Sequence, residues 1–348
     1  MNDHDIPSTK HSETKMNTSF HALRRALLRR LCGSAAALLP LMAAGPATAA
    51  PFPTGPITMI VGYPPGGSND IVARLIAPVL GKALGATVVV ENKAGASGLI
   101  GTNHVAKAKP DGQTILLSSI SPVVLSPQTM KEVPFDSLKD LAPINTVGDT
   151  PEAIATGPSL KVNSLKELLD YAKTKEVTLS SSGVGGLPHL TIELLKAASG
   201  GKIMHVPYKG AGPAVTDTLA GHVNGIVMDL PPLYALIKDG RLHALAVTSA
   251  QRVDFLKEIP TAQEELPNFN VVNWVGVFAP AGTPDDILDK YDAAIKKALA
   301  NPELRQKLQD VAVVPSTMEN RQAFTAFFKQ EYKRWGDVLK EAKVELKE

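Results

Sequence analysis

The sequence predicts an α/β protein of two lobes, each built on a mostly parallel sheet flanked by helices. Short β-branched runs alternate with segments of helical periodicity, an order typical of parallel strands joined by right-handed crossovers. About three hundred residues follow a basic and apolar N-terminal segment. That length is sufficient for two lobes and for a core that needs no disulfide.

The first forty-nine residues have the order of a secretory signal peptide. The segment "HALRRALLRR" is basic, "LCGSAAALLPLMAA" is apolar, and Ala47-Thr48-Ala49 has the pattern of a cleavage site. The apolar part is too short to span a bilayer, so we expect an exported protein cleaved near Ala49. Residues 1–15 would be an upstream extension if translation starts at Met16 instead of Met1. The arginine pairs leave both the Sec and the twin-arginine routes open.

Cleavage of this segment changes the net charge of the protein and its cysteine content. It carries six Lys or Arg and three Asp or Glu, so a chain of formal net charge +2 leaves a mature part near −1. Nucleic acid is therefore not an expected partner, because its binding needs clustered basic residues. Cys32 is the only cysteine and leaves with the segment, so no disulfide is expected.

The first lobe is predicted to begin with a β-α-β-α-β unit. Its strands are expected at 57–61, 87–90 and 114–117, and its helices at 71–80 and 99–107.

The second lobe repeats this order. Ser164 and Glu167 have the spacing of a capping box at the start of a helix. Further strands are expected at 177–181, 203–206, 226–228 and 242–247, and helices near 188–198, 213–220 and 233–238.

The chain is then predicted to return to the first lobe through the apolar segment 271–278. Pro284 is expected at the first position of the next helix, and Phe324, Phe328, Trp335 and Leu339 have the spacing of a last long one. The predicted division is a signal peptide at 1–49, the first lobe at 50–152, the second lobe at 153–272, and a return with C-terminal helices at 273–348.

Four loops that lead from a strand into a helix are rich in Gly and Ser. The first, "VGYPPGGSND", contains no Lys, Arg or His. Ligands of parallel α/β sheets bind beyond the carboxyl ends of strands, and amides at a helix N-terminus attract anions without a basic side chain. The loops and Asp229 supply these candidate ligand-binding residues: Tyr63, Pro65, Gly66, Gly67, Ser68, Asn69, Asp70, Ala96, Ser97, Gly98, Ser182, Gly183, His189, Tyr208, Lys209 and Gly210.

The donor supply favours a small carboxylate. Hydrogen bonds to a charged group contribute about 1.5–3 kcal/mol each, so four to six donors could reach the about 8 kcal/mol of micromolar binding. No Walker motif is present for a phosphate ester. Asp70 is expected either to supply a first-turn charge or to face an ammonium group of the ligand, and Asp229 either lines the cleft or leads into a helix.

Catalytic chemistry has weaker support. There is no G-x-S-x-G nucleophile elbow and no H-x-x-x-H pair, so neither a metal nor another cofactor is expected. A secreted hydrolase that uses Ser182 and His189 remains an alternative, although a first-turn histidine that donates to ligand or neighbouring backbone is favoured.

At these loops the chain resembles a known family. The succession "YPPGGSNDIVAR", "VVVENKAGASGLIGT", "PDGQTILL", "SSGVGGLPHL", "HVPYKGAGPAVTDTLAGHV", "IPTAQEE" and "NWVGVFAPAGTP" is similar to the Bug family, the TctC-type solute-binding proteins of tripartite tricarboxylate transport systems. The resemblance runs from about Phe52 to the C-terminus. It implies a periplasmic protein with the two-lobed periplasmic-binding-protein fold, which closes like a flytrap on a small organic anion.

The resemblance also implies roles and partners. Residues 63–70 would grip a ligand carboxyl group through backbone amides, 92–98 would complete the first-lobe side, and Ser182, Gly183, His189 and 208–212 would approach from the second lobe. The implied partners are a small carboxylate and membrane permease subunits, and the protein is expected to act as a monomer. A ligand-sensing adaptor for a sensor kinase is the alternative. The ligand stays open among dicarboxylates, tricarboxylates, acidic amino acids and aromatic acids.

Overall fold

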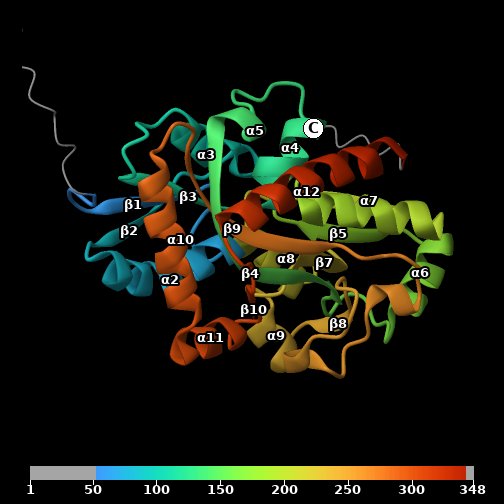
Figure 1. Cartoon of the computed structure of the whole chain (residues 1–348). Coiled ribbons are helices and arrows are strands. Elements are labelled where there is room, and N and C mark those ends of the chain that lie inside the picture. The colour runs from blue at the N-terminus through green and yellow to red at the C-terminus, as the bar shows by residue number, and fades with distance from the viewer. Residues whose placement is uncertain (1–51, 342–348) are drawn as a thin grey trace, which may run out of the picture. The chain divides into compact units, whose positions relative to one another are not determined.

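The computed structural model describes residues 52–341, and the predicted signal peptide lies outside them. Within this range the strands and helices alternate along the chain (Figure 1). No helix of this part combines the length and the hydropathy that a bilayer crossing requires.

Ten strands of the described chain form one continuous sheet in the order β2-β1-β3-β9-β4-β7-β5-β6, and β8 and β10 pair with β4. The β1, β2 and β3 strands are parallel to one another, as are β5, β6 and β7. Between these groups, β9 and β4 run antiparallel to their neighbours. The strands are β1 Ile57–Val61, β2 Val88–Asn92, β3 Thr114–Ser119, β4 Leu141–Thr156, β5 Val177–Ser181, β6 Ile203–Pro207, β7 Gly225–Asp229, β8 His243–Val247, β9 Val272–Pro280 and β10 Val314–Pro315.

The long strand β4 joins two lobes. Its residues 141–151 pair with β9, and its residues 152–156 pair with β7 and β8. The chain returns after β8 to β9, and the amide of Val271 donates to the carbonyl of Thr248 at 2.9 Å on the way. The predicted fold class, two lobes that each contain a parallel sheet, is confirmed. The predicted boundaries of the lobes remain predictions.

Helices cover the sheet (Figure 1). The α-helices are α2 Ser68–Leu84, α3 Leu99–Ala106, α4 Ser126–Thr129, α5 Ser137–Asp140, α6 Leu165–Thr174, α7 Leu187–Ser199, α8 Ala211–Leu219, α9 Tyr234–Lys238, α10 Asp285–Leu299, α11 Pro302–Gln309 and α12 Arg321–Glu341. Shorter helical turns are η1 Ala96–Gly98, η2 Ser121–Leu125, η3 Asp254–Leu256 and η4 Ala262–Glu264.

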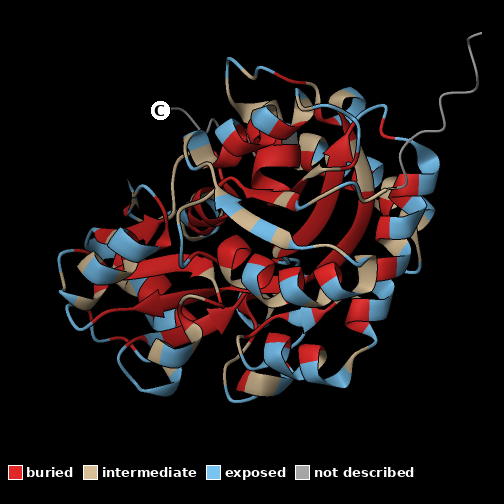
Figure 2. Ribbon diagram, turned by 90° about the vertical axis from the view of Figure 1, so that its left-hand side faces the viewer, coloured by how far each residue is buried: buried red, intermediate tan, exposed pale blue. Residues whose placement is uncertain are grey.

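The buried side chains form three clusters. One packs α2, α10 and α11 on the first-lobe strands, and another packs α8 on β4, β7 and β8. The third reaches both lobes through η2, α7 and α12. In it, Trp274 of β9 meets the ring of Phe324 edge-on, with 5.7 Å between centroids. Figure 2 shows the result, with buried strands and exposed outer faces on the helices.

The strand β4 has no counterpart among the predicted elements. Its sequence "LAPINTVGDTPEAIAT" contains two prolines and a Gly-Asp pair, which indicate turns. The structure accommodates them with register shifts near Pro143 and between Thr146 and Gly148. These irregularities break the period of two by which a strand is identified.

Two predicted helix starts differ in detail. Pro284 precedes α10 as its N-cap and is not the first helical residue. At α6, Ser164 Oγ accepts from the amide of Glu167, as a capping box requires. The side chain of Glu167 accepts from the amide of Asn163 at 2.8 Å instead of that of Ser164, so the box is only half formed.

Candidate functional site

A cavity lies between the two lobes at the carboxyl ends of β1, β3, β5 and β7. It contains about 410 Å³ of space, part of which is open to solvent. The residues that line it are Tyr63, Pro64, Gly67, Ser68, Asn69, Ser119, Ser121, Ser182, Pro188, Ala211, Met228 and Asp229.

The N-terminus of α2 opens into this cavity. Gly67 precedes the helix with φ −80° and ψ 167°, and no side chain caps it. The first backbone bond of the helix runs from the amide of Ile71 to the carbonyl of Gly67 at 3.0 Å. The preceding amides have no acceptor within the helix, and Ser68 and Asn69 in this turn are buried lining residues. A helix end of this kind attracts an anion.

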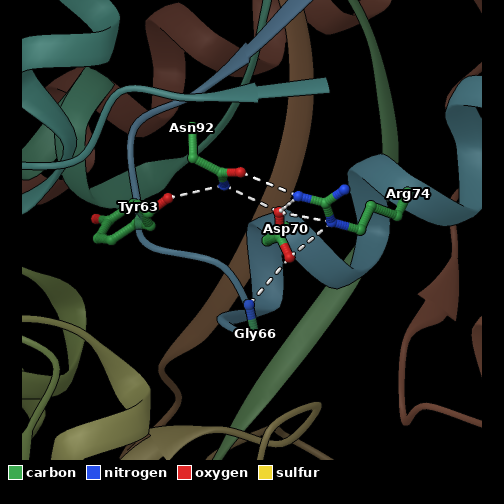
Figure 3. Close-up of polar contacts among 5 residues, drawn as sticks. All are labelled: Tyr63, Gly66, Asp70, Arg74 and Asn92. Carbon is green, nitrogen blue, oxygen red and sulfur yellow. Dashed lines mark hydrogen bonds and ion pairs between the residues drawn. The ribbon is translucent and has the colours of Figure 1, made fainter. Parts of the chain in front are cut away.

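Asp70 gives the first loop its shape (Figure 3). Its carboxylate accepts from the amide of Gly66 at 2.9 Å, from Asn92 Nδ2 at 2.9 Å and from Arg74 Nε at 3.0 Å. Partial burial opposes ionisation, but the hydrogen bonds from Arg74, Gly66 and Asn92 hold the pKa of Asp70 below its ordinary value. Asp70 is not among the lining residues and forms an ion pair with Arg74, in agreement with a first-turn charge, while the alternative contact with a ligand ammonium group stays a prediction.

The loop around Ser97 joins the lobes and does not line the cavity. Tyr63 Oη donates to the carbonyl of Ser97 at 2.9 Å, and burial together with the charge of Asp229 raises the pKa of this phenol. Ser97 Oγ donates to the carbonyl of Val184 in the second lobe. A Cβ at Gly98 would lie 3.1 Å from the ring of Tyr63, which explains a glycine with φ 95° there.

The loops of the second lobe contribute unequally to the lining of the cavity. Ser182 lines the cavity, whereas Tyr208 directs its hydroxyl to Asp217 at 2.7 Å and Lys209 is exposed. Gly210 has φ 105°, and a Cβ there would lie 3.0 Å from the ring of Pro64 across the interface.

His189 is engaged by its own loop. Its Nδ1 accepts from the amide of Gly185 at 3.1 Å, and its ring stacks on His205 with 3.9 Å between centroids. Burial lowers the pKa of His189 to about 4, so the ring is neutral near pH 7. This histidine therefore contacts backbone, as favoured for a first-turn histidine, but it accepts the hydrogen bond, so the predicted donation to backbone is wrong for Nδ1.

Of the predicted ligand-binding residues, six line the cavity: Tyr63, Gly67, Ser68, Asn69, Ser182 and Asp229. The remainder lie around it or behind it, and their contact with a ligand stays a prediction: Pro65, Gly66, Asp70, Ala96, Ser97, Gly98, Gly183, His189, Tyr208, Lys209 and Gly210.

Sequence reasoning missed Ser119 and Ser121. Asn69 Nδ2 donates to Ser119 Oγ at 3.2 Å, and Ser121 Oγ accepts from the amide of Leu187 at 2.9 Å across the interface. A signal was present, because "LLSSIS" ends a parallel strand at the edge where ligands bind. Pro64 and Ala211 belong to the segments 63–70 and 208–212 that the resemblance implied, whereas Pro188 and Met228 complete the lining without a comparable signal.

In the described part of the chain, the lining combines polar with apolar side chains and includes no cationic one. Among the described residues that form it, Asp229 is the one acid, and Lys, Arg and His are absent. Desolvation raises the pKa of Asp229 to about 6, although hydrogen bonds from Ser68 and Asn273 oppose the shift. No group of three or more described His, Cys, Asp or Glu side chains could ligate a metal ion. The geometry suits an anion held by amides and hydroxyls.

The comparison with protein families agrees with this geometry. A model described as the tripartite tricarboxylate transporter family receptor matches residues 72–344. The chain belongs to this receptor family. The resemblance to the Bug and TctC-type solute-binding proteins is therefore confirmed.

Several members of the receptor family are similar over most of their length. BugT of Bordetella pertussis (strain Tohama I) is 38% identical over 310 residues, which are 87% of this chain and 94% of BugT. The structure of the periplasmic binding protein BugD superposes with a TM-score of 0.80 at 35% identity, covering 84% of this chain and 99% of BugD. The R. palustris protein Rpa4515, solved with adipate, has a TM-score of 0.80 at 30% identity and covers 84% of this chain and 98% of its own.

Proposed function

We propose that this protein is a periplasmic binding protein that captures a small organic carboxylate and delivers it to the membrane permease subunits of a tripartite tricarboxylate-type transporter. The observation that carries the proposal is the interlobe cavity at the N-terminus of α2, whose described lining supplies hydroxyl and amide groups and no cationic side chain, in a member of a receptor family. The predicted signal peptide supports export. The proposal assigns binding and no catalysis.

The donors are sufficient for the task. Six hydroxyl or amide side chains line the cavity beside the first-turn amides of α2, namely Tyr63, Ser68, Asn69, Ser119, Ser121 and Ser182. The Tyr63 hydroxyl is engaged with the carbonyl of Ser97, so five remain. Hydrogen bonds to a charged group contribute about 1.5–3 kcal/mol each, and micromolar affinity needs about 8 kcal/mol. Four or five such bonds give about 6–15 kcal/mol, a range that brackets this value and leaves a margin for the ordering of the ligand in its upper half.

Contacts between the lobes supply a closing mechanism. Ser97 Oγ donates to the carbonyl of Val184, and Ser126 Oγ donates to that of Gly185 at 3.2 Å. We propose that these contacts form as the lobes close, with β4 and the segment between β8 and β9 as the hinge. In this account 50–152 and 273–348 form one lobe, 153–272 form the other, and the closed monomer is recognised by the permease.

The ligand class follows from the cavity and the relatives. The cavity is lined by hydroxyl and amide side chains and opens to solvent, and Rpa4515 was solved with adipate. We therefore propose a small aliphatic carboxylate, most simply a dicarboxylate whose first carboxylate binds at the N-terminus of α2 while its other end meets the second lobe.

The test is a thermal-shift screen of the mature protein against mono-, di- and tricarboxylates, acidic amino acids and aromatic acids, followed by calorimetry. We expect at least one carboxylate to bind at micromolar or lower Kd, and its uncharged diamide not to bind. Ser68→Ala should weaken binding, whereas Ser159→Ala, at an exposed site that donates to Val223, should not. Preferential binding of uncharged solutes, or ester turnover lost in Ser182→Ala, would contradict the proposal.

A further inference from the structure

Two carboxyl groups lie side by side at the cavity. Glu152 of β4 and Asp229 of β7 are directly paired residues in antiparallel strands. Such pairs project from the same face of a sheet with Cβ atoms about 5 Å apart. Asp229 lines the cavity, and Glu152 is completely buried. The pair therefore connects the ligand space with the interior of the second lobe.

The surroundings do not neutralise two negative charges. Glu152 Oε2 accepts from Thr191 Oγ1, while Oε1 has no hydrogen-bond partner among the described residues. Asp229 Oδ1 accepts from Asn273 Nδ2 at 3.1 Å. No ion pair within residues 52–340 involves either acid. Because a buried charge without a counter-ion is strongly unfavourable, at least one of the two acids must carry a proton.

We propose that Glu152 and Asp229 form a proton-binding site, in which Glu152 stays protonated and Asp229 takes up a proton as an organic anion enters the cavity. The solute is then bound together with a proton, and the anion does not meet a second negative charge. The coupling to an anion rests on the proposed function, whereas the shared proton in the empty protein does not.

The electrostatics of the pair agree with the geometry. Burial, and then the charge of Asp229, raises the pKa of Glu152 well above its ordinary value. Desolvation raises that of Asp229 to about 6. In the empty protein Glu152 is thus neutral near pH 7 while Asp229 is mostly ionised. An anion beside Asp229 raises its pKa further and draws in a proton.

The other groups near the pair stay fixed in charge above about pH 5. Tyr63 of the first lobe is neutral because burial and the charge of Asp229 raise its pKa. Burial lowers the pKa of His189 on α7 to about 4, and burial with the neighbouring His189 lowers that of His205 on β6 to about 3. On α2, Asp70 is paired with Arg74. The uncharged neighbours are Ser68 on α2, Thr191 on α7, Thr248 after β8 and Asn273 on β9.

The sign of the effect follows by linkage. Below about pH 6, Asp229 is already protonated without ligand, so the affinity for a fully ionised acid does not change with pH. Above that value, each unit of pH weakens binding by up to about tenfold, because a proton must be taken up. The pH dependence of the affinity ends at the pH where Asp229 loses its proton in the complex as well.

The proton site is tested first in the ligand-free protein. Infrared spectra of the mature protein near pH 7 should contain a protonated carboxyl band that is lost in Glu152→Gln. The control Asp239→Asn removes an exposed acid of the same lobe and should leave the band unchanged. A spectrum without a protonated carboxyl group, or a band that survives Glu152→Gln, would overturn the proposal.

The coupling is tested by calorimetry with adipate in buffers of different ionisation enthalpy. Wild-type protein should take up close to one proton per adipate at about pH 8, where adipate is fully ionised, and less at about pH 6.5, where Asp229 is already partly protonated. Asp229→Asn should abolish the uptake and flatten the pH dependence of Kd, and Asp239→Asn should retain both. Binding without proton uptake would overturn the coupling. If no carboxylate of the screen binds, the proposed function fails, and the infrared result still decides the proton site.

Discussion

The network around Asp70 gives the most quantitative prediction. This side chain is 5% exposed and accepts from a backbone amide, an asparagine and an arginine at 2.9–3.0 Å. An Asp70→Asn substitution keeps one acceptor oxygen but replaces the other oxygen with an amide NH2 group. This group is a donor, and it would lie against the N–H donors that the carboxylate now accepts from. Loss of about one charge-assisted hydrogen bond costs about 1.5–3 kcal/mol. For a chain of this size the melting temperature should fall by roughly 3–10 °C.

The matched control is Arg74→Gln. The side chain of Arg74 is 53% exposed, so its ion pair is screened and should contribute at most about 1 kcal/mol. The expected order of stability is therefore wild type, Arg74→Gln, then Asp70→Asn. Since the pKa of Asp70 is lowered in the folded protein, its contribution is present above the ordinary aspartate range and is lost as the pH falls through the folded value.

The assay is urea denaturation of the mature proteins near pH 7 and at acid pH, with calorimetry of the best carboxylate. Asp70→Asn should also weaken binding, because the loop that shapes the N-terminus of α2 loses its anchor. If Asp70→Asn is as stable as wild type, or if Arg74→Gln costs more than Asp70→Asn, the reasoning is refuted.

Three further substitutions test other contacts. Ser97→Ala removes the bond to Val184 between the lobes, so affinity should fall roughly 2–10-fold in calorimetry, and unchanged affinity would contradict the closing contact. Gly210→Ala places a Cβ beside Pro64 on a residue with φ 105°, so the free energy of unfolding in urea should fall by about 1–2 kcal/mol. Gly212→Ala, which has open space around it, should leave the free energy of unfolding unchanged. The wild-type His205 is kept neutral in the folded state, so it should lower the free energy of unfolding by up to roughly 1.4 kcal/mol per pH unit as the pH falls from about 6.5 to about 4. His205→Gln should remove this contribution. A urea denaturation profile over this pH range that matches wild type would contradict this.

The parallel strands could be predicted from the sequence because each is a short apolar run between turn signals. The prediction for β5, 177–181, coincides with the structure, and that for β1 does as well. The antiparallel strand β4 could not be found, since Pro143, Gly148 and Pro151 indicate turns and are tolerated only with register shifts against β9. Its long-range pairing overrides the local signal.

The candidate site could be predicted in part for the same reason. The rule that ligands bind at strand ends places Ser68, Asn69 and Ser182 at a common edge, and the structure brings them together. The rule does not say which side of a loop faces the other lobe. Asp70 and Ser97 are therefore predicted to contact the ligand, but one shapes its own loop and the other joins the lobes, and neither lines the cavity, so their contact with a ligand stays a prediction. The pairing of Glu152 with Asp229 depends on the register of β4, which no local pattern reveals.

The most direct test of the account is a crystal structure of the mature protein grown with the carboxylate that gives the largest thermal shift. We predict a carboxylate group at the N-terminus of α2, within hydrogen-bonding distance of first-turn amides and of the hydroxyls of Ser119 or Ser121, and without an Arg or Lys contact. A solute bound outside this cavity, or held there mainly by cationic side chains, would contradict the central claim.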